Sequence, residues 1–103
     1  MFKISSTDLE IVKQVLKSHV AGCEVRAFGS RVNGGEAKKY SDLDLVIIGR
    51  SKLSSRKLTE LKSAFQESDL SIRVDILDWR RIPARFKKMI DAKYEILQNA
   101  RSE

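Results

Sequence analysis

The sequence contains one cysteine, one proline and one histidine among its 103 residues. The single thiol, Cys23, excludes an intramolecular disulfide and is typical of a reducing compartment, so we expect a cytoplasmic protein. The single histidine, His19, has no second histidine or cysteine at ligand spacing, and we interpret it as a surface residue at a helix end. The sequence therefore predicts neither a disulfide-stabilised fold nor a zinc site.

Long apolar runs and aromatic residues are also scarce. No run approaches the roughly 20 residues that a membrane span needs, and the N-terminal segment lacks the apolar stretch of a signal peptide, so we expect no membrane association. Aromatic residues make up 7% of the chain, too few among the cations to favour stacking of single-stranded nucleic acid. The Gly-Lys-Ser/Thr signature of a P-loop NTPase is absent as well.

What the sequence does contain is 42% hydrophobic and 33% charged residues, with a formal net charge of +6. Its length allows one core, and we expect residues 1–103 to form a single domain. The positive charge favours an anionic partner, which could be a nucleotide, a nucleic acid or an acidic protein surface. A basic cluster around Pro83 is interpreted as a solvated helix face, with docking of an acidic partner or RNA as the alternative; it consists of Arg80, Arg81, Arg85, Lys87 and Lys88.

Hydrophobic periodicity predicts helices that alternate with three strands. We expect helices over 7–20, 55–68 and from Pro83 to about Asn99, and strands over 24–28, 43–48 and 71–78. The first helix has a capping box formed by Thr7 and Glu10. Helices alternating with strands predict a two-layer α/β domain.

Two aspartates open the second predicted strand. Residues two apart in a strand share a face, so the side chains of Asp42 and Asp44 point the same way. Two like charges so close are destabilising unless a cation lies between them, and Mg²⁺ is the simplest cation for clustered carboxylates. Gly29 and Ser30 form the kind of turn that binds a phosphate. This stretch therefore predicts a metal–nucleotide site.

A third carboxylate, Asp75, falls in the third predicted strand. Ile72, Val74 and Ile76 alternate toward the core, which leaves Asp75 on the other face. If the second and third strands are neighbours, Asp75 joins Asp42 and Asp44 in the arrangement that two-metal nucleotidyl transfer needs. The alternative is a surface residue paired with Arg73 or a lysine.

The residues after Gly29 have less specific interpretations. Ser30 could cap a short helical turn as well as bind a phosphate, because a cap site is also an anion site. Arg31 lies next to the turn and is expected to reach a phosphate, whereas Lys38 and Lys39 are expected to be solvated.

Gly29-Ser30, Asp42-x-Asp44 and the later Asp75 together resemble the nucleotidyltransferases of the DNA polymerase β-like superfamily. In length and arrangement the chain is similar to the minimal nucleotidyltransferases (MNT) of MNT/HEPN toxin–antitoxin pairs, over residues 8 to about 97. The resemblance implies a nucleotidyltransferase fold with a three-stranded mixed sheet, helices on one face, and the active site on the open face.

The resemblance also implies a role for each motif residue. Gly29 and Ser30 would hold the β- and γ-phosphates of a nucleoside triphosphate. Asp42 and Asp44 would ligate two Mg²⁺ ions. Asp75 would complete the catalytic metal site and help to activate the acceptor hydroxyl.

The activity implied is transfer of AMP from ATP to a hydroxyl, notably a tyrosine of a HEPN-domain partner whose RNase activity is thereby silenced. Two alternatives stay open at this point. The chain could be an antitoxin that neutralises its partner by binding alone, or it could transfer a nucleotide to RNA. The sequence does not decide the oligomeric state, and a homo-oligomer is one option.

Overall fold

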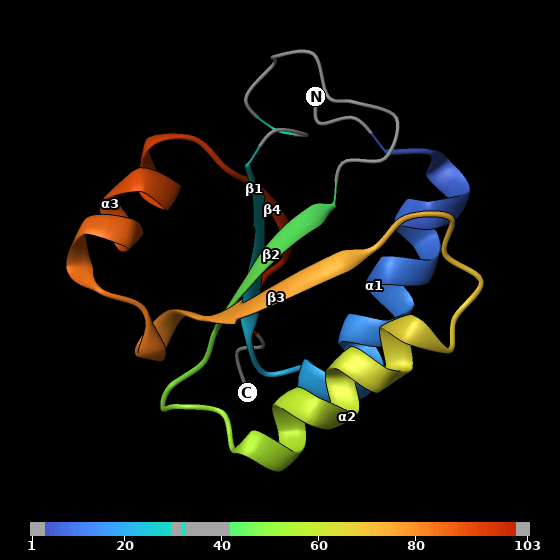
Figure 1. The fold of residues 1–103 in the computed structure, drawn as a ribbon, viewed down its shortest axis with the longest axis horizontal. Helices are drawn as coiled ribbons and strands as arrows, with labels where there is room; N and C mark the ends of the chain where they lie inside the picture. Colours follow the sequence, from blue (N-terminus) through green and yellow to red (C-terminus); the bar gives the residue numbers. More distant parts are fainter. Residues whose placement is uncertain (1–3, 30–31, 33–41, 101–103) are drawn as a thin grey trace.

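A computed structural model describes residues 4–29, 32 and 42–100 as a four-stranded sheet with helices on both faces (Figure 1). In chain order the elements are α1 (Ser6–Val20), β1 (Glu24–Phe28), β2 (Leu43–Ile48), α2 (Ser55–Gln66), β3 (Val74–Asp78), the 3₁₀ turn η1 (Trp79–Arg81), α3 (Ala84–Ala92) and β4 (Glu95–Gln98). The strand order is β3-β2-β1-β4. The sheet is mixed, because β2 runs parallel to β3 while β1 runs antiparallel to both of its neighbours.

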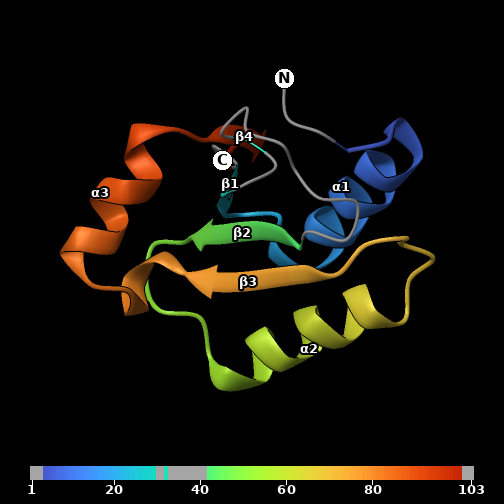
Figure 2. The same cartoon turned by 45° about the horizontal axis from the view of Figure 1, so that its top comes forward.

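The main core lies between the sheet and the helices α1 and α2, which cover the same face (Figures 1 and 2). Leu16 of α1, Leu61 of α2 and Leu45 of β2 are fully buried there. The predicted alternation of β2 is confirmed, since its core-facing residues Leu43, Leu45 and Ile47 belong to this cluster. Burial of this apolar stripe is the main source of the domain's stability.

The first helix begins earlier than its sequence predicts. Ser5 is the N-cap residue, and its hydroxyl accepts the backbone N–H of Asp8 at 3.1 Å. The expected cap at Thr7 is therefore wrong, because Ser5 offers a capping hydroxyl two residues earlier and the helix starts at Ser6.

Helix α3 covers the opposite face of the sheet, so the expectation of helices on one face only is wrong. Its residue Ile90 is buried against Phe28 of β1 and Val46 of β2. Arg26 of β1 also holds α3 in place, through an ion pair with Asp91 at 2.7 Å. The physical reason is that β1 and β2 carry apolar side chains on this face too, and these need cover.

A fourth strand replaces the second half of the predicted last helix. Helix α3 ends at Ala92, and β4 pairs antiparallel with β1, with Ile96 opposite Arg26 and Glu95 opposite Ala27. The three-stranded sheet and the helix to Asn99 are thus corrected. The edge of β1 would otherwise carry unpaired backbone groups, and pairing with β4 satisfies them.

The other boundaries moved by a few residues. Helix α2 ends at Gln66 rather than at residue 68, and β3 begins at Val74 rather than at residue 71. In the described residues no helix is long and apolar enough to cross a bilayer.

Candidate active site

The acidic end of β2 lies directly beside the end of β1. The antiparallel register places Asp44 opposite Phe28, so Gly29 follows next to the carboxylate. Gly29 has a φ of 85°, a left-handed conformation that favours glycine, and a Cβ built on it would overlap Asp44 Oδ2. Glycine is therefore needed here both for its backbone conformation and for the space it leaves beside Asp44.

The two other predicted residues of this turn, Ser30 and Arg31, lie outside the described residues, as do Lys38 and Lys39. The backbone on the far side of the turn is described at one position. Val32 donates its N–H to the carbonyl oxygen of Gly29 at 3.0 Å and is buried in the main core.

The parallel pairing of β2 and β3 brings the predicted carboxylates together. Asp44 stands directly opposite Asp75 in the register, and Asp42 lies two residues before Asp44 on the same side of the chain. Val74 and Ile76 both contact the main core, which leaves Asp75 on the opposite face, as expected. Asp75 is exposed, whereas Asp42 and Asp44 are half-buried.

These carboxylates act on one another electrostatically. Partial burial raises the pKa of Asp44 above its ordinary value of 3.8, and the negative charges of Asp75 and then Asp42 raise that pKa further. Between described residues, none of the ion pairs involves any of the three aspartates. Among the described residues, Asp75 therefore does not form the ion pair with Arg73 that was the alternative expectation.

The donor set fits a divalent cation by its chemistry. Carboxylate oxygens are the ligands that Mg²⁺ prefers, and the like charges that raise the pKa of Asp44 are those that a bound cation would offset. The described side chains do not form a ready cage, because no three His, Cys, Asp or Glu residues among them are grouped closely enough to hold a metal. Asp42, Asp44 and Asp75 are the described residues that could supply such ligands.

A pocket of about 390 Å³ lies between this face of the sheet and α3. Its lining combines two carboxylates, one lysine and several apolar side chains: Phe28, Gly29, Asp44, Asp75, Leu77, Phe86, Met89 and Lys93. The rings of Phe28 and Phe86 meet edge to face, with centroids 6.2 Å apart. A pocket lined by both charged and apolar side chains suits a ligand that has both an anionic and an apolar part.

Sequence reasoning missed the three pocket residues that follow Pro83, namely Phe86, Met89 and Lys93. The apolar spacing of α3 was visible, but nothing local indicated which face of the sheet it would cover. Met89 is 51% accessible although it lies on a helix beside a pocket, and only the tertiary structure reveals this exposure.

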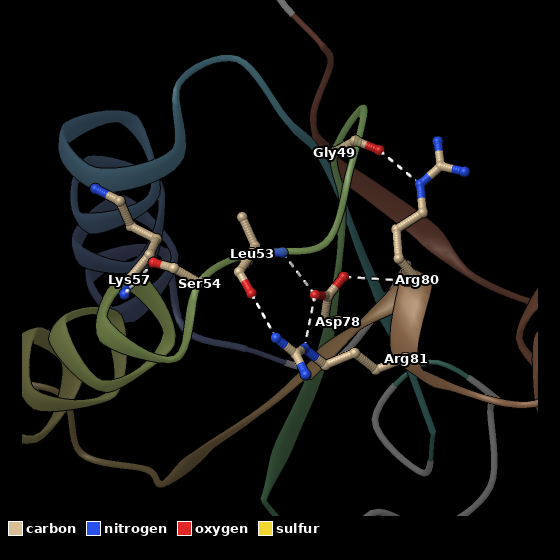
Figure 3. A network of polar contacts seen from close by, with 7 residues as sticks. All are labelled: Gly49, Leu53, Ser54, Lys57, Asp78, Arg80 and Arg81. Atoms are coloured by element: carbon tan, nitrogen blue, oxygen red, sulfur yellow. Dashed lines mark hydrogen bonds and ion pairs between the residues drawn. The ribbon is translucent and has the colours of Figure 1, made fainter.

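A second polar group, centred on Asp78, lies at the opposite end of β3 (Figure 3). The buried Asp78 carboxylate accepts the backbone N–H groups of Leu53, at 2.8 Å, and Arg80, at 3.0 Å, and pairs with Arg81 at 3.3 Å. Arg80 and Arg81 also donate to the carbonyl oxygens of Gly49 and Leu53. Two arginines of the basic cluster thus have a structural use that the sequence did not indicate.

The comparison with known families identifies the family of the chain. The family model for polymerase β nucleotidyltransferases matches residues 8–103. This chain belongs to the polymerase β nucleotidyltransferase family. The expected resemblance is thereby confirmed. A curated relative, the probable protein adenylyltransferase MntA of Haemophilus influenzae, is 48% identical over 95 residues, which are 92% of this chain and 82% of the relative.

Chains of solved toxin–antitoxin structures have the same fold. A chain of a toxin–antitoxin structure with AMP-PNP matches with a TM-score of 0.73 at 20% identity, covering 88% of this chain and 73% of that one. A chain of the complex between the tri-AMPylated HEPN toxin of Shewanella oneidensis and its MNT antitoxin matches with a TM-score of 0.68 at 16% identity, covering 93% and 73%. At these identities the likeness concerns the fold.

Proposed function

We propose that this nucleotidyltransferase is a Mg²⁺-dependent protein adenylyltransferase that transfers AMP from ATP to a hydroxyl of a HEPN-type toxin partner. The observation that carries the proposal is the register of β2 and β3, in which Asp75 stands opposite Asp44 beside the Gly29 bend. Family membership and the relative named as a probable protein adenylyltransferase support the reaction class.

Each residue then has a defined task in the transfer. Gly29 and Ser30 bind the β- and γ-phosphates, with Arg31 beside them, and so orient the α-phosphorus toward the acceptor. The acceptor oxygen forms a bond to the α-phosphorus while the bond to pyrophosphate breaks. Asp75 receives the hydroxyl proton at its carboxylate.

Asp42, Asp44 and Asp75 would hold the magnesium ions. When bound, these ions supply charge neutralisation at the triphosphate and a lowered pKa of the attacking hydroxyl. The ligand roles of the three aspartates explain why the chain tolerates their mutual repulsion. Three clustered carboxylates would otherwise lower the stability without a structural benefit.

The partner assignment rests on the relatives. One matching structure holds an AMPylated HEPN toxin, and another holds AMP-PNP, an ATP analogue.

A second candidate function is that of an antitoxin that neutralises its partner by complex formation without catalysis, and transfer to RNA is a third. We keep as predictions that residues 1–103 act as one domain and that the protein works in the cytoplasm.

The test is incubation of the chain with ATP, Mg²⁺ and a HEPN-domain toxin, followed by mass spectrometry of both proteins. We expect the partner to gain the mass of one or more AMP groups. The double variant Asp42→Ala with Asp44→Ala should lose the transfer, and Asp69→Ala, an exposed acidic residue outside the site, should keep it.

The alternatives give different results in the same experiment. Tight complex formation without a mass change, unaffected by the double variant, would indicate the binding antitoxin. When an RNA is included in the reaction, a gain of AMP mass on the RNA but not on the partner would indicate the RNA activity.

A further inference from the structure

Lys93 is the cation of the pocket that the motif residues do not explain. It is the only positively charged residue among the described residues that line the pocket, and it lies there together with Gly29, Asp44 and Asp75. Lys93 lies between α3 and β4, and none of the motif residues falls in that segment.

The pairing of β4 with β1 brings Lys93 to the same end of the sheet as Gly29. Glu95 of β4 pairs with Ala27 of β1, Lys93 precedes Glu95 by two residues, and Gly29 follows Ala27 by two residues; both Lys93 and Gly29 line the pocket. The backbone is extended at Lys93, and its N–H donates to the carbonyl oxygen of Ile90 at 3.1 Å. The backbone is thus anchored to a fully buried residue of α3.

The side chain, in contrast, is exposed and takes part in none of the ion pairs between described residues. Other cations nearby are engaged: Arg26 pairs with Glu24 and Asp91, and Lys87 lies 5.5 Å from the centre of the Trp79 ring. Within the part of the chain that the structure describes, the Lys93 ammonium group therefore has no ion-pair partner, and it lines a pocket that also contains two carboxylates.

We propose that Lys93 binds the β- and γ-phosphates of the nucleotide held at Gly29. The inference rests on the proposed function and deepens it, since it adds a charged ligand for the triphosphate. Backbone N–H groups at a glycine turn are neutral donors, and a lysine ammonium adds a positive charge that strengthens the binding of a polyanion. The positive charge matters more here because two carboxylates, Asp44 and Asp75, line the same pocket and would repel a triphosphate.

The test is calorimetric titration of the full chain with AMP-PNP and with AMP, each in the presence of Mg²⁺. Lys93→Ala should weaken AMP-PNP binding by about tenfold, as expected for the loss of one charge-assisted contact. AMP binding should stay unchanged, because AMP lacks the phosphates that Lys93 contacts. Lys93→Arg should restore most of the AMP-PNP affinity.

Lys88→Ala is the matched control, because Lys88 is an exposed lysine of α3 that does not line the pocket. It should bind AMP-PNP like the unmodified chain. In the transfer assay, Lys93→Ala should raise KM for ATP more than it lowers kcat.

Equal AMP-PNP affinity of Lys93→Ala and the unmodified chain would overturn the inference, as would an equal loss of affinity for AMP-PNP and AMP. A Lys93-dependent affinity without any AMP transfer to the partner would support the inference while contradicting the proposed function. Absence of AMP-PNP binding by the unmodified chain would overturn both.

Discussion

Asp44 combines partial burial with two neighbouring carboxylates, and both effects raise its pKa. In the unfolded chain the burial and the neighbouring charges are lost, so the carboxyl releases its proton more readily there than in the folded protein. The folded state then binds more protons than the unfolded state as the pH rises above about 3.8, and its stability falls. The charge at Asp44 therefore lowers the stability of the metal-free protein at neutral pH.

Asp44→Asn should thus raise the melting temperature of the metal-free protein by a few degrees at pH 7, and the gain should disappear in acid near the ordinary carboxyl pKa. The same variant should lose AMP transfer. Calorimetric melting in EDTA across this pH range checks the stability, and Asp69→Asn is the control. A variant less stable than the unmodified chain at pH 7 would show that Asp44 is not under net repulsion.

Gly29 is the other residue whose identity is set by its position. Gly29→Ala places a methyl group against Asp44 Oδ2 in a left-handed backbone conformation. We expect a loss of about 1–2 kcal/mol in the free energy of unfolding from the backbone term alone. Urea denaturation and titration with AMP-PNP measure the two consequences.

The control for Gly29→Ala is Gly22→Ala, because a Cβ at Gly22 meets nothing within 4 Å and no left-handed conformation is required there. Gly22→Ala should change neither stability nor binding substantially. Equal behaviour of the two variants would contradict the role given to Gly29.

At the scale of elements, the Asp78 group joins the end of β3 and the turn η1, which follows it directly, to a segment 25 residues earlier in the chain. It connects the end of β3 to the segment between β2 and α2 and to the turn η1, which leads to α3 (Figure 3). The carboxylate is 3% exposed, and in the described residues it neutralises Arg81 while it satisfies two backbone N–H groups. The group therefore sets the direction in which the chain leaves β3 toward the second face of the sheet.

Asp78→Ala should lower the free energy of unfolding by about 2–4 kcal/mol, because it leaves two N–H groups and one arginine without their acceptor. Urea denaturation measures the loss. Asp69→Ala, at an exposed position, should change stability by no more than about 0.5 kcal/mol. A small effect of Asp78→Ala would mean that water replaces the carboxylate at little cost.

Most elements were predictable because their signals are local. The strands 24–28 and 43–48 and the facing of their side chains follow from alternation and from the glycines that bound them. Helix α2 follows from its apolar spacing and from Ser54, whose hydroxyl accepts the N–H of Lys57. The Asp78 group was not predictable, because its partners lie 25 residues apart in one case and face each other only after folding.

At the scale of the whole molecule, the last strand closes the sheet by pairing with the first. Strand β4 contributes Leu97 to the main core, and its neighbour Ile96 faces away and is 48% exposed. Adjacent residues with opposite burial fit the alternation of a strand. The two residues therefore offer a matched test of how β4 packs on the sheet.

Leu97→Asp should unfold the protein or lower its stability by several kcal/mol, because it buries a charge in the main core. Ile96→Asp should be tolerated with a far smaller loss. Circular dichroism and urea denaturation of both variants measure the difference. Similar losses for both would contradict the burial of Leu97 in the main core and the exposure of Ile96.

The sequence by itself determined the motif residues Asp42, Asp44, Asp75 and Gly29 and the strand face of each aspartate, because alternation and a turn are local properties. The pairing of β2 with β3, which brings Asp75 opposite Asp44, was decided by the tertiary structure. It also determined the family, which the comparison of residues 8–103 bears out. Tertiary structure alone decided that the segment after Ala92 pairs with β1 and that α3 covers the face of the carboxylates. The reason is that strand pairing and face selection depend on which backbone edges and apolar side chains remain uncovered, and no local pattern contains that information.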